Sequence, residues 1–170
     1  MNGRITTMKL ERQEGGTLTV ASMYVPVQPR ERLQFLIKLR GKDYLNGADI
    51  IGMDANCVAN VRIDTRRADP VKTPYTNLHA SKLEDMLADI GMRDVYRLMH
   101  GNAASGFTRE CKSIATRLDR IYTRVGSDLE WLSIRVNATF NQITCPSDHR
   151  AVDATLQYGI PPQKIKGEKK

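Results

Sequence analysis

Four short polar segments supply the side chains of this sequence that could do chemistry. They are Tyr24 before Val25-Pro26, Asp54-Ala55-Asn56, Asp119 within Arg117-Leu118-Asp119, and Ser147-Asp148-His149. Carboxylate, amide, phenol and imidazole groups can orient a water molecule, move a proton, donate a hydrogen bond to an oxyanion or hold a hard cation. Together they make up the donor set of a hydrolytic site.

Each segment also has a purely structural interpretation. Asp54 and Asn56 are residue types preferred in turns, and Ser147-Asp148-His149 fits a capped loop equally well. A carboxylate is disfavoured in a half-buried strand, so an ion pair with Arg117 or another neighbour would also explain Asp119. Tyr24 fits the core of a strand. Taken singly, the segments leave both interpretations open.

The shared feature of the four segments is their place at or near the end of an expected strand. Sheet proteins collect active-site groups at one such edge, because rigid strands position the side chains and the adjoining loops leave them accessible. The sequence therefore favours one common site over four unrelated local structures.

Six strands are expected to position this site, from alternating or continuous apolar stretches bounded by turn residues. They cover residues 4–11, 17–25, 49–53, 117–124, 131–139 and 150–158. The first two form a hairpin through Gly15-Gly16. Asp54 follows the third strand directly, and that short apolar run indicates a buried strand.

Two helices are expected between these strands. Residues 29–40 begin with Pro29, which suits a first helical turn, and they end before Gly41. Residues 82–90 follow Ser81, whose spacing to Glu84 is that of a capping box, and carry apolar side chains at helical intervals. Since several strands follow one another near the end of the chain without a helix between them, the pattern favours a layered α/β sandwich over a doubly wound sheet.

Composition limits the class of protein. The chain has 170 residues, of which 41% are hydrophobic and 26% charged, as in a single globular domain, and its net charge of +7 suits a polyanionic partner. The cysteines Cys57, Cys111 and Cys145 cannot all pair within the chain, which favours a reducing compartment. With neither a membrane-length apolar run nor a signal-like start, we expect an intracellular protein of the nucleus or cytoplasm, without membrane contact.

The order of the motifs resembles the endonuclease/exonuclease/phosphatase superfamily, which includes abasic-site endonucleases, pancreatic deoxyribonuclease and inositol phosphatases. Four strings look most like the endonuclease domain of non-LTR retrotransposons. They are Ile51-Gly52-Met53-Asp54-Ala55-Asn56, Asp94-Val95-Tyr96-Arg97, Gly106-Phe107-Thr108-Arg109 and Thr116-Arg117-Leu118-Asp119-Arg120-Ile121-Tyr122. The resemblance implies an α/β fold, a four-layer sandwich of two packed mixed sheets flanked by helices, and metal-dependent hydrolysis of phosphodiesters.

The resemblance also implies a role for each site residue. Asp54 would orient or deprotonate the attacking water, Asn56 would donate to a phosphate oxygen, and Tyr24 would contact the phosphate. His149 would donate to a non-bridging oxygen, with Asp119 holding its tautomer and favouring its protonated form. Asp148 would lie near Mg²⁺ or Mn²⁺.

The implied substrate is DNA, nicked to leave a 3′-hydroxyl for priming by a reverse transcriptase domain of the full-length element. An arginine-rich stretch would contact the backbone phosphates. Its members are Arg109, Lys112, Arg117 and Arg120.

The same motifs occur in phosphatases, so a phosphatase acting on a small phosphoester is an alternative. A catalytically dead module that only binds nucleic acid is another.

The family pattern also predicts where the domain is incomplete. Family members carry two early strands, one ending in Asn and one holding a metal-binding Glu, before the segment that 17–26 resembles. We therefore expect residues 1–158 to form a partial sandwich without those strands, with impaired catalysis. Residues 159–170, which contain Pro161-Pro162 and four lysines, are expected to form a basic linker-like tail.

Overall fold

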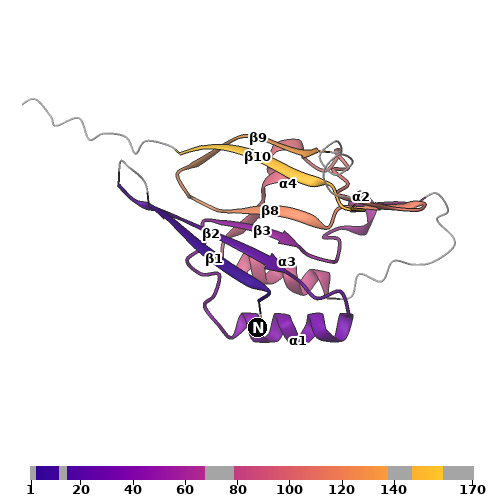
Figure 1. Ribbon diagram of the computed structural model, residues 1–170, viewed down its shortest axis with the longest axis horizontal. Helices are drawn as coiled ribbons and strands as arrows, with labels where there is room; N and C mark the ends of the chain where they lie inside the picture. The colour runs from indigo at the N-terminus through magenta and orange to yellow at the C-terminus, as the bar shows by residue number, and fades with distance from the viewer. Residues whose placement is uncertain (1–2, 12–14, 68–78, 138–146, 159–170) are drawn as a thin grey trace, which may run out of the picture.

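The centre of the molecule is a mixed five-stranded sheet in the order β1-β2-β3-β8-β5 (Figure 1). The computed structural model describes residues 3–11, 15–67, 79–137 and 147–158. The strands of this sheet are β1 (Ile5–Glu11), β2 (Thr17–Tyr24), β3 (Ile50–Asp54), β5 (Met92–Asp94) and β8 (Asp119–Arg124). Strands β2 and β3 are parallel, and the other neighbours are antiparallel.

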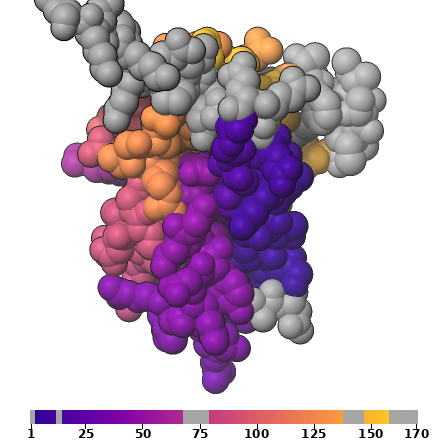
Figure 2. Space-filling model, turned by 90° about the vertical axis from the view of Figure 1, so that its left-hand side faces the viewer, coloured from indigo at the N-terminus to yellow at the C-terminus, as the bar shows by residue number. Residues whose placement is uncertain are grey.

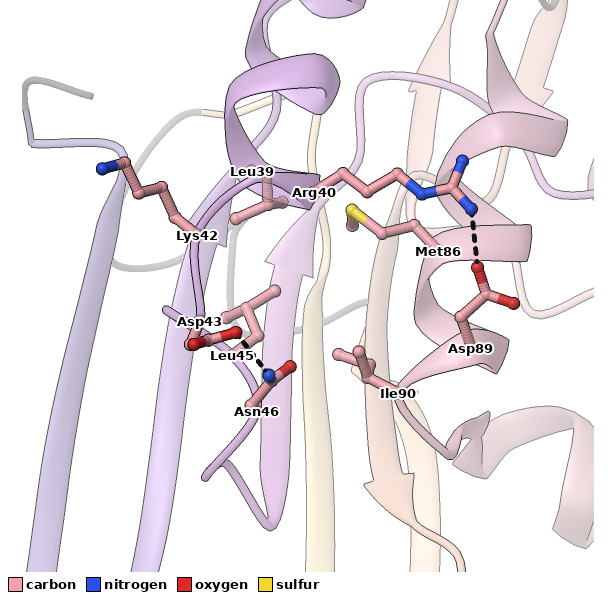
Figure 3. A pocket seen from close by; sticks show the side chains of 9 residues that line it. All are labelled: Leu39, Arg40, Lys42, Asp43, Leu45, Asn46, Met86, Asp89 and Ile90. Atoms are coloured by element: carbon pink, nitrogen blue, oxygen red, sulfur yellow. Dashed lines mark hydrogen bonds and ion pairs between the residues drawn. The ribbon is translucent and has the colours of Figure 1, made fainter.

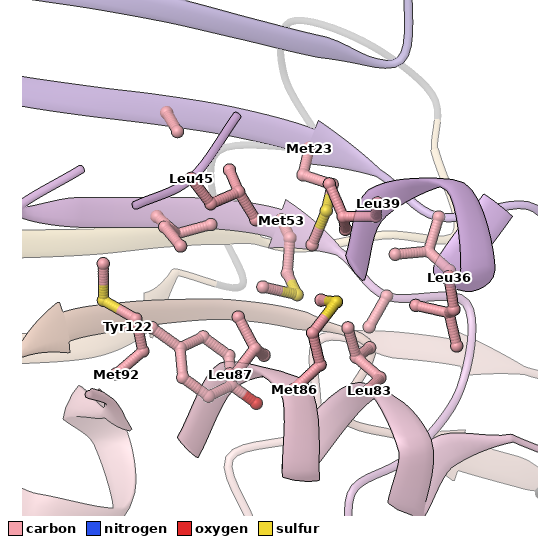
Figure 4. Close-up of a cluster of buried hydrophobic side chains, with 14 of the residues drawn as sticks. Met23, Leu36, Leu39, Leu45, Met53, Leu83, Met86, Leu87, Met92 and Tyr122 are labelled. Carbon is pink, nitrogen blue, oxygen red and sulfur yellow. The ribbon is translucent and has the colours of Figure 1, made fainter. Parts of the chain in front are cut away.

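One face of this sheet is covered by two helices. α1 (Pro29–Arg40) begins with the expected proline and connects the parallel strands β2 and β3, and α3 (Ala80–Asp89) packs beside it. Figure 4 shows their apolar side chains meeting those of the sheet. The members of this core that it labels are Met23, Leu36, Leu39, Leu45, Met53, Leu83, Met86, Leu87, Met92 and Tyr122, all of which are buried.

Strand alternation decides on which face the polar residues lie. Met23 and Met53 point into the helix-covered core. Because successive side chains of a strand point to opposite faces, the next residues, Tyr24 and Asp54, lie on the other face. Each strand ends within one residue of its expected end, and the alternation places two candidate residues on the same side of the sheet.

The second face is covered by a two-stranded sheet and a short helix. β9 (Leu129–Asn137) and β10 (Ala151–Tyr158) pair antiparallel, and α4 (Val95–His100) contacts both β8 and β9. Figure 1 shows the order of layers, with α1 and α3 below the central sheet and α4 with β9 and β10 above it. The expected α/β sandwich is confirmed.

A third, small sheet was not predicted from the sequence. β4 (Thr65–Arg67), β6 (Arg109–Cys111) and β7 (Ile114–Thr116) pair in the order β4-β7-β6, and α2 (Val61–Asp64) precedes them. Strands of three residues are too short to show an alternating pattern, so only tertiary pairing reveals them.

The expected capping box of α3 is wrong. The N-cap residue is His79, in a left-handed conformation with φ of 70°, and it makes no side-chain capping bond. Glu84, which would complete the box, instead accepts hydrogen bonds from Arg120 and the Tyr122 hydroxyl. A buried guanidinium needs a carboxylate more than a helix terminus does, since an unpaired buried charge is costly.

A view from the left-hand side of Figure 1 shows how these elements lie beside one another (Figure 2). In Figure 2, β1 and β2 in indigo lie beside the purple chain that contains α1 and β3, with α3 in pink beyond.

Cys57 is a buried free thiol and Cys111 an exposed one. Among the described residues, no helix is long and apolar enough to cross a membrane. Cys145, residues 138–139 of the predicted strand and the predicted tail 159–170 lie outside the described residues.

Candidate active site

The centre of the candidate site is formed by Asp54, Asp119 and His149. Asp54, at the end of β3, is the direct antiparallel partner of Asp119, at the start of β8. His149 comes from the segment before β10, and its Nδ1 lies 2.9 Å from Asp119 Oδ2. The expected pairing of Asp119 with His149 is present, and the alternative ion pair of Asp119 with Arg117 is not.

The pKa values of Asp54 and His149 are both raised, but for different reasons. Burial raises the pKa of Asp54, and the nearby Asp119 raises it further, although a hydrogen bond from the Asn56 amide opposes both. The hydrogen bond to Asp119 raises the pKa of His149, against the opposing effect of burial. One carboxylate is thus made more basic, while the imidazole is held toward its protonated form.

Asn56 follows Asp54 in a tight local structure. Its backbone N–H donates to Asp54 Oδ1 at 2.9 Å, and its φ is 47°, in the left-handed region where asparagine is common. Its side-chain amide donates to the Val25 carbonyl at 2.7 Å, which fixes the orientation of the amide. The turn interpretation is therefore correct for the backbone, and it also places the amide beside the ends of β2 and β3.

Tyr24 is not a core residue. It lies directly across the parallel pair from Asp54, and 44% of its surface is exposed. The guanidinium of Arg4 lies 5.3 Å from its ring centre. Its hydroxyl can therefore face a bound ligand on the same side of the sheet as the Asp54 carboxylate.

Asp148 has a different partner from the one expected. Its Oδ2 lies 2.7 Å from Arg109 Nε, and both side chains are exposed. Slight burial opposes the effect, but the hydrogen bond from Arg109 lowers the pKa of Asp148. Asp148 is not a member of the close cluster of Asp54, Asp119 and His149. A metal ion at Asp148 would have to compete with this guanidinium.

Two of the expected nucleic-acid contacts are corrected by the structure. Arg117 is 1% exposed and Arg120 2%, so neither can reach a backbone phosphate. Arg117 donates to Asp64 and Asp94, and Arg120 to Glu84 and the Cys57 carbonyl. Both guanidinium groups are therefore paired inside the protein. Arg109 and Lys112 remain at the surface.

Buried ion pairs of Asp64 hold together the segments that carry the site residues. Asp64, with no exposed surface, accepts from Arg117 Nε at 2.7 Å and also pairs with Arg97. It thereby connects the chain that follows Asn56 to the start of β8. Sequence analysis missed Asp64, because a single carboxylate in a short polar stretch carries no signal of burial.

The centre also fits a divalent cation. Ligand atoms of Asp54, Asp119 and His149 all lie within 4.8 Å of one another. The two facing carboxylates repel each other, and burial raises the pKa of Asp54, so a hard cation that prefers oxygen ligands would relieve both costs. The donor set therefore suits Mg²⁺ or Mn²⁺.

A separate cavity of about 230 Å³ lies on the helix-covered side, at the ends of α1 and α3 (Figure 3). Two polar pairs line it: Arg40 donates to Asp89, and Asn46 donates to Asp43. Leu39, Leu45, Met86 and Ile90 supply its apolar part. No catalytic constellation converges there, so the Asp54 centre is the better candidate site.

Comparison with known proteins gives a likeness of fold. No protein-family model matches the sequence, and a search of curated proteins gives no significant match. Among solved structures, the endonuclease domain of TRAS1, a telomere-specific non-LTR retrotransposon, superposes with a TM-score of 0.60 at 17% identity, covering 95% of this chain. The 3′-5′ exonuclease NExo from Neisseria meningitidis gives 0.68 at 16% identity over 91%. The AP endonuclease LMAP from Leishmania major gives 0.70 at 14% over 93%.

These likenesses establish the class of fold. The chain has the α/β sandwich fold of these endonucleases and this exonuclease, the fold that its motifs indicated. One structure with this fold belongs to a non-LTR retrotransposon, the type that the sequence resembles most. The chain covers 65% of the TRAS1 domain, 65% of NExo and 55% of LMAP, which is less than two thirds of each.

Proposed function

We propose that this chain is a metal-dependent DNA endonuclease domain of the retrotransposon type, which nicks a strand and leaves a 3′-hydroxyl. The observation that carries the proposal is the convergence of Asp54 and Asp119, from neighbouring strands of the central sheet, with His149, from the segment before β10, on one accessible edge. A structural role alone would not require a half-buried pair of facing carboxylates beside a histidine.

The proposed chemistry divides the work among these groups. Asp54, whose pKa is raised by burial, accepts a proton from the attacking water or orients it. His149 is held by Asp119 through Nδ1, so Nε2 is left to donate to a non-bridging phosphate oxygen. The amide of Asn56 and the hydroxyl of Tyr24 contact other phosphate oxygens.

The proposed metal is Mg²⁺ or Mn²⁺. Asp54 and Asp119 would hold it through carboxylate oxygens, with Asp148 contributing if Arg109 moves away. Such an ion supplies charge neutralisation for the pentacovalent transition state. A cluster with so few carboxylates binds Mg²⁺ weakly, because the ion gives up its water reluctantly. We therefore expect slow cleavage that needs millimolar metal.

The proposed substrate is DNA, with priming of a reverse transcriptase as the biological use of the nick. The net charge of +7 favours a polyanion; Arg109, which is half-buried, forms a bridge with His149, and Lys112 is exposed in the turn that follows β6. The structural neighbours support this choice through their own activities: one is a retrotransposon endonuclease, and NExo has been solved bound to a product DNA hairpin.

A phosphatase is the second candidate. The same NExo is described as a 3′ phosphatase in its DNA-bound structure, so this fold accommodates a terminal phosphoester. None of Asp54, Asn56 and His149 distinguishes a terminal from an internal phosphate.

The test is nicking of supercoiled plasmid by the 170-residue chain in Mg²⁺, Mn²⁺ or EDTA, alongside a DNA with a 3′-phosphate and a gel shift. Metal-dependent nicks that a polymerase can extend support the endonuclease, and 3′-phosphate release without nicking supports the phosphatase. DNA binding without either reaction identifies a binding module. His149→Gln and Asp54→Asn should abolish cleavage, whereas Lys38→Gln, in α1 on the other side of the sheet, should not.

A further inference from the structure

A short segment centred on Thr108 contacts both the chain at Asp119 and the chain at His149. This buried residue, 1% exposed, lies just before β6. Its Oγ1 accepts hydrogen bonds from the backbone N–H groups of Leu118 and Asp119, both at 2.9 Å. One hydroxyl oxygen thus fixes the peptide at the start of β8, where the Asp119 side chain begins.

The backbone of Thr108 contacts the other half of the site. Its carbonyl oxygen accepts a hydrogen bond from the Arg150 N–H at 2.6 Å, next to His149. The following residue, Arg109, forms an antiparallel bridge with His149, and Glu110 N–H donates to the Asp148 carbonyl at 3.0 Å. A single short segment therefore holds both Asp119 and His149.

We propose that Thr108 is the positioning residue of the Asp119–His149 pair, which sets the two groups at hydrogen-bond distance although Asp119 begins β8 and His149 lies in the separate segment before β10. The inference rests on the proposed function for its catalytic meaning, but the positioning itself is a property of the fold. The Thr108 hydroxyl accepts from the backbone N–H of Asp119, so it acts through the backbone.

The residue type follows from this role. The two N–H groups that Thr108 satisfies are buried or nearly so, and leaving such a group unpaired costs about 1–3 kcal/mol. A hydroxyl oxygen has two lone pairs and can accept both bonds. Valine has the same shape but no acceptor. With valine the peptide at Asp119 would turn to find another partner and carry its carboxylate away from His149.

A glycine, Gly106, fixes the course of the chain that leads into Thr108. Gly106 has a φ of +55°, and a Cβ at this position would lie only 2.5 Å from the ring of Tyr96. The Tyr96 ring therefore packs directly on the Gly106 backbone, which fixes the entry of the chain into Thr108. The segment Gly106-Phe107-Thr108 therefore acts as a structural unit that positions Asp119.

The experiment compares Thr108→Val and Thr108→Ser in the full chain. Two controls are Thr123→Val, which removes a buried hydroxyl that has no hydrogen-bond partner among the described residues, and Leu87→Ala, which destabilises the core on the helix side. Nitrogen-15 NMR at one fixed pH records the His149 Nδ1–H signal, assigned with His149→Gln. Amide hydrogen exchange of Leu118 and Asp119 is measured in parallel, followed by kcat and KM for DNA cleavage.

We expect Thr108→Val to lose the His149 Nδ1–H signal and to speed exchange of the two amides at least about tenfold, the factor that corresponds to about 1.4 kcal/mol. Thr108→Ser should retain both signals. Thr123→Val and Leu87→Ala should also retain the His149 signal, Leu87→Ala despite a lower melting temperature. Cleavage by Thr108→Val should fall through kcat rather than KM.

The proposal is overturned if Thr108→Val keeps the His149 signal and the amide protection, or if Leu87→Ala loses the signal equally. Should Thr108→Val not fold, Thr108→Cys keeps the test decisive, because sulfur is a weaker acceptor: unchanged exchange at Leu118 and Asp119 would then contradict the proposal. Since the NMR and exchange measurements need no turnover, an inactive wild-type chain would count against the proposed function alone.

Discussion

Asp54 and Asp119 face each other directly across the antiparallel strands β3 and β8. Two carboxylates opposite each other on one sheet face repel, and the neutral form of one of them is favoured. Burial raises the pKa of Asp54 and the facing Asp119 carboxylate raises it further, whereas Asp119 has the His149 imidazole as a partner. The site is therefore built at a cost in stability.

The first prediction concerns that cost. Asp54→Asn keeps the acceptor for the Asn56 N–H but removes the repelling charge. It should raise the free energy of unfolding at pH 7 by about 0.5–2 kcal/mol, the usual range of single stabilising substitutions, while abolishing cleavage. Urea denaturation measures the change. A raised folded-state pKa disfavours only the ionised form, so the gain should shrink as the pH falls toward 3.8.

Asp119→Asn is the matched control for this prediction. It removes the other carboxylate of the facing pair but also the partner of His149, so it should destabilise the chain. Equal stabilisation by both substitutions would contradict the asymmetry described above.

The second prediction is a pH dependence of stability. The hydrogen bond to Asp119 raises the pKa of His149 in the folded chain above its ordinary 6.5. The stabilisation from this pair is therefore fully present below pH 6.5 and is lost as the pH rises through the folded-state pKa. His149→Gln should lower the melting temperature more at pH 5.5 than at pH 8.5. A penalty that grows with pH would contradict the pairing.

The third prediction concerns the buried carboxylate Asp64. Burial opposes its ionisation, but hydrogen bonds from Arg117 and Arg97 lower the pKa of Asp64 overall. Asp64→Asn should cost about 3–5 kcal/mol, as is typical when one partner of a buried ion pair is removed. The control is Asp89→Asn, which breaks an exposed pair with Arg40 and should cost about 1 kcal/mol or less. Urea unfolding distinguishes the two.

The fourth prediction concerns DNA affinity. Lys112→Gln removes an exposed charge in the turn between β6 and β7. It should weaken binding and reduce the salt dependence of the binding constant by about one unit of slope. Lys38→Gln, in α1, should change neither. Filter binding at several salt concentrations measures both, and identical slopes for the two variants would exclude Lys112 from the interface.

Elements with a strong local pattern could be predicted from the sequence. The hairpin of β1 and β2, helix α1 and strand β3 have their expected bounds within about two residues, because alternation, Pro29 and an apolar run are local signals. The small β4-β7-β6 sheet gave no such signal. Glu84 was expected to cap α3, and only the packing of Arg120 against it determined otherwise.

The sequence by itself determined which residue types could share a phosphoester site and that Tyr24, Asp54 and Asp119 stand at strand ends, because these are properties of local pattern. Only the tertiary structure decided whether each charged side chain is buried and which partner it has. Arg109 and Arg117 look alike in the sequence, yet one is exposed beside Asp148 and the other is buried against Asp64. Burial and pairing depend on residues distant in the chain, and they set both the pKa of a group and whether it can reach a substrate.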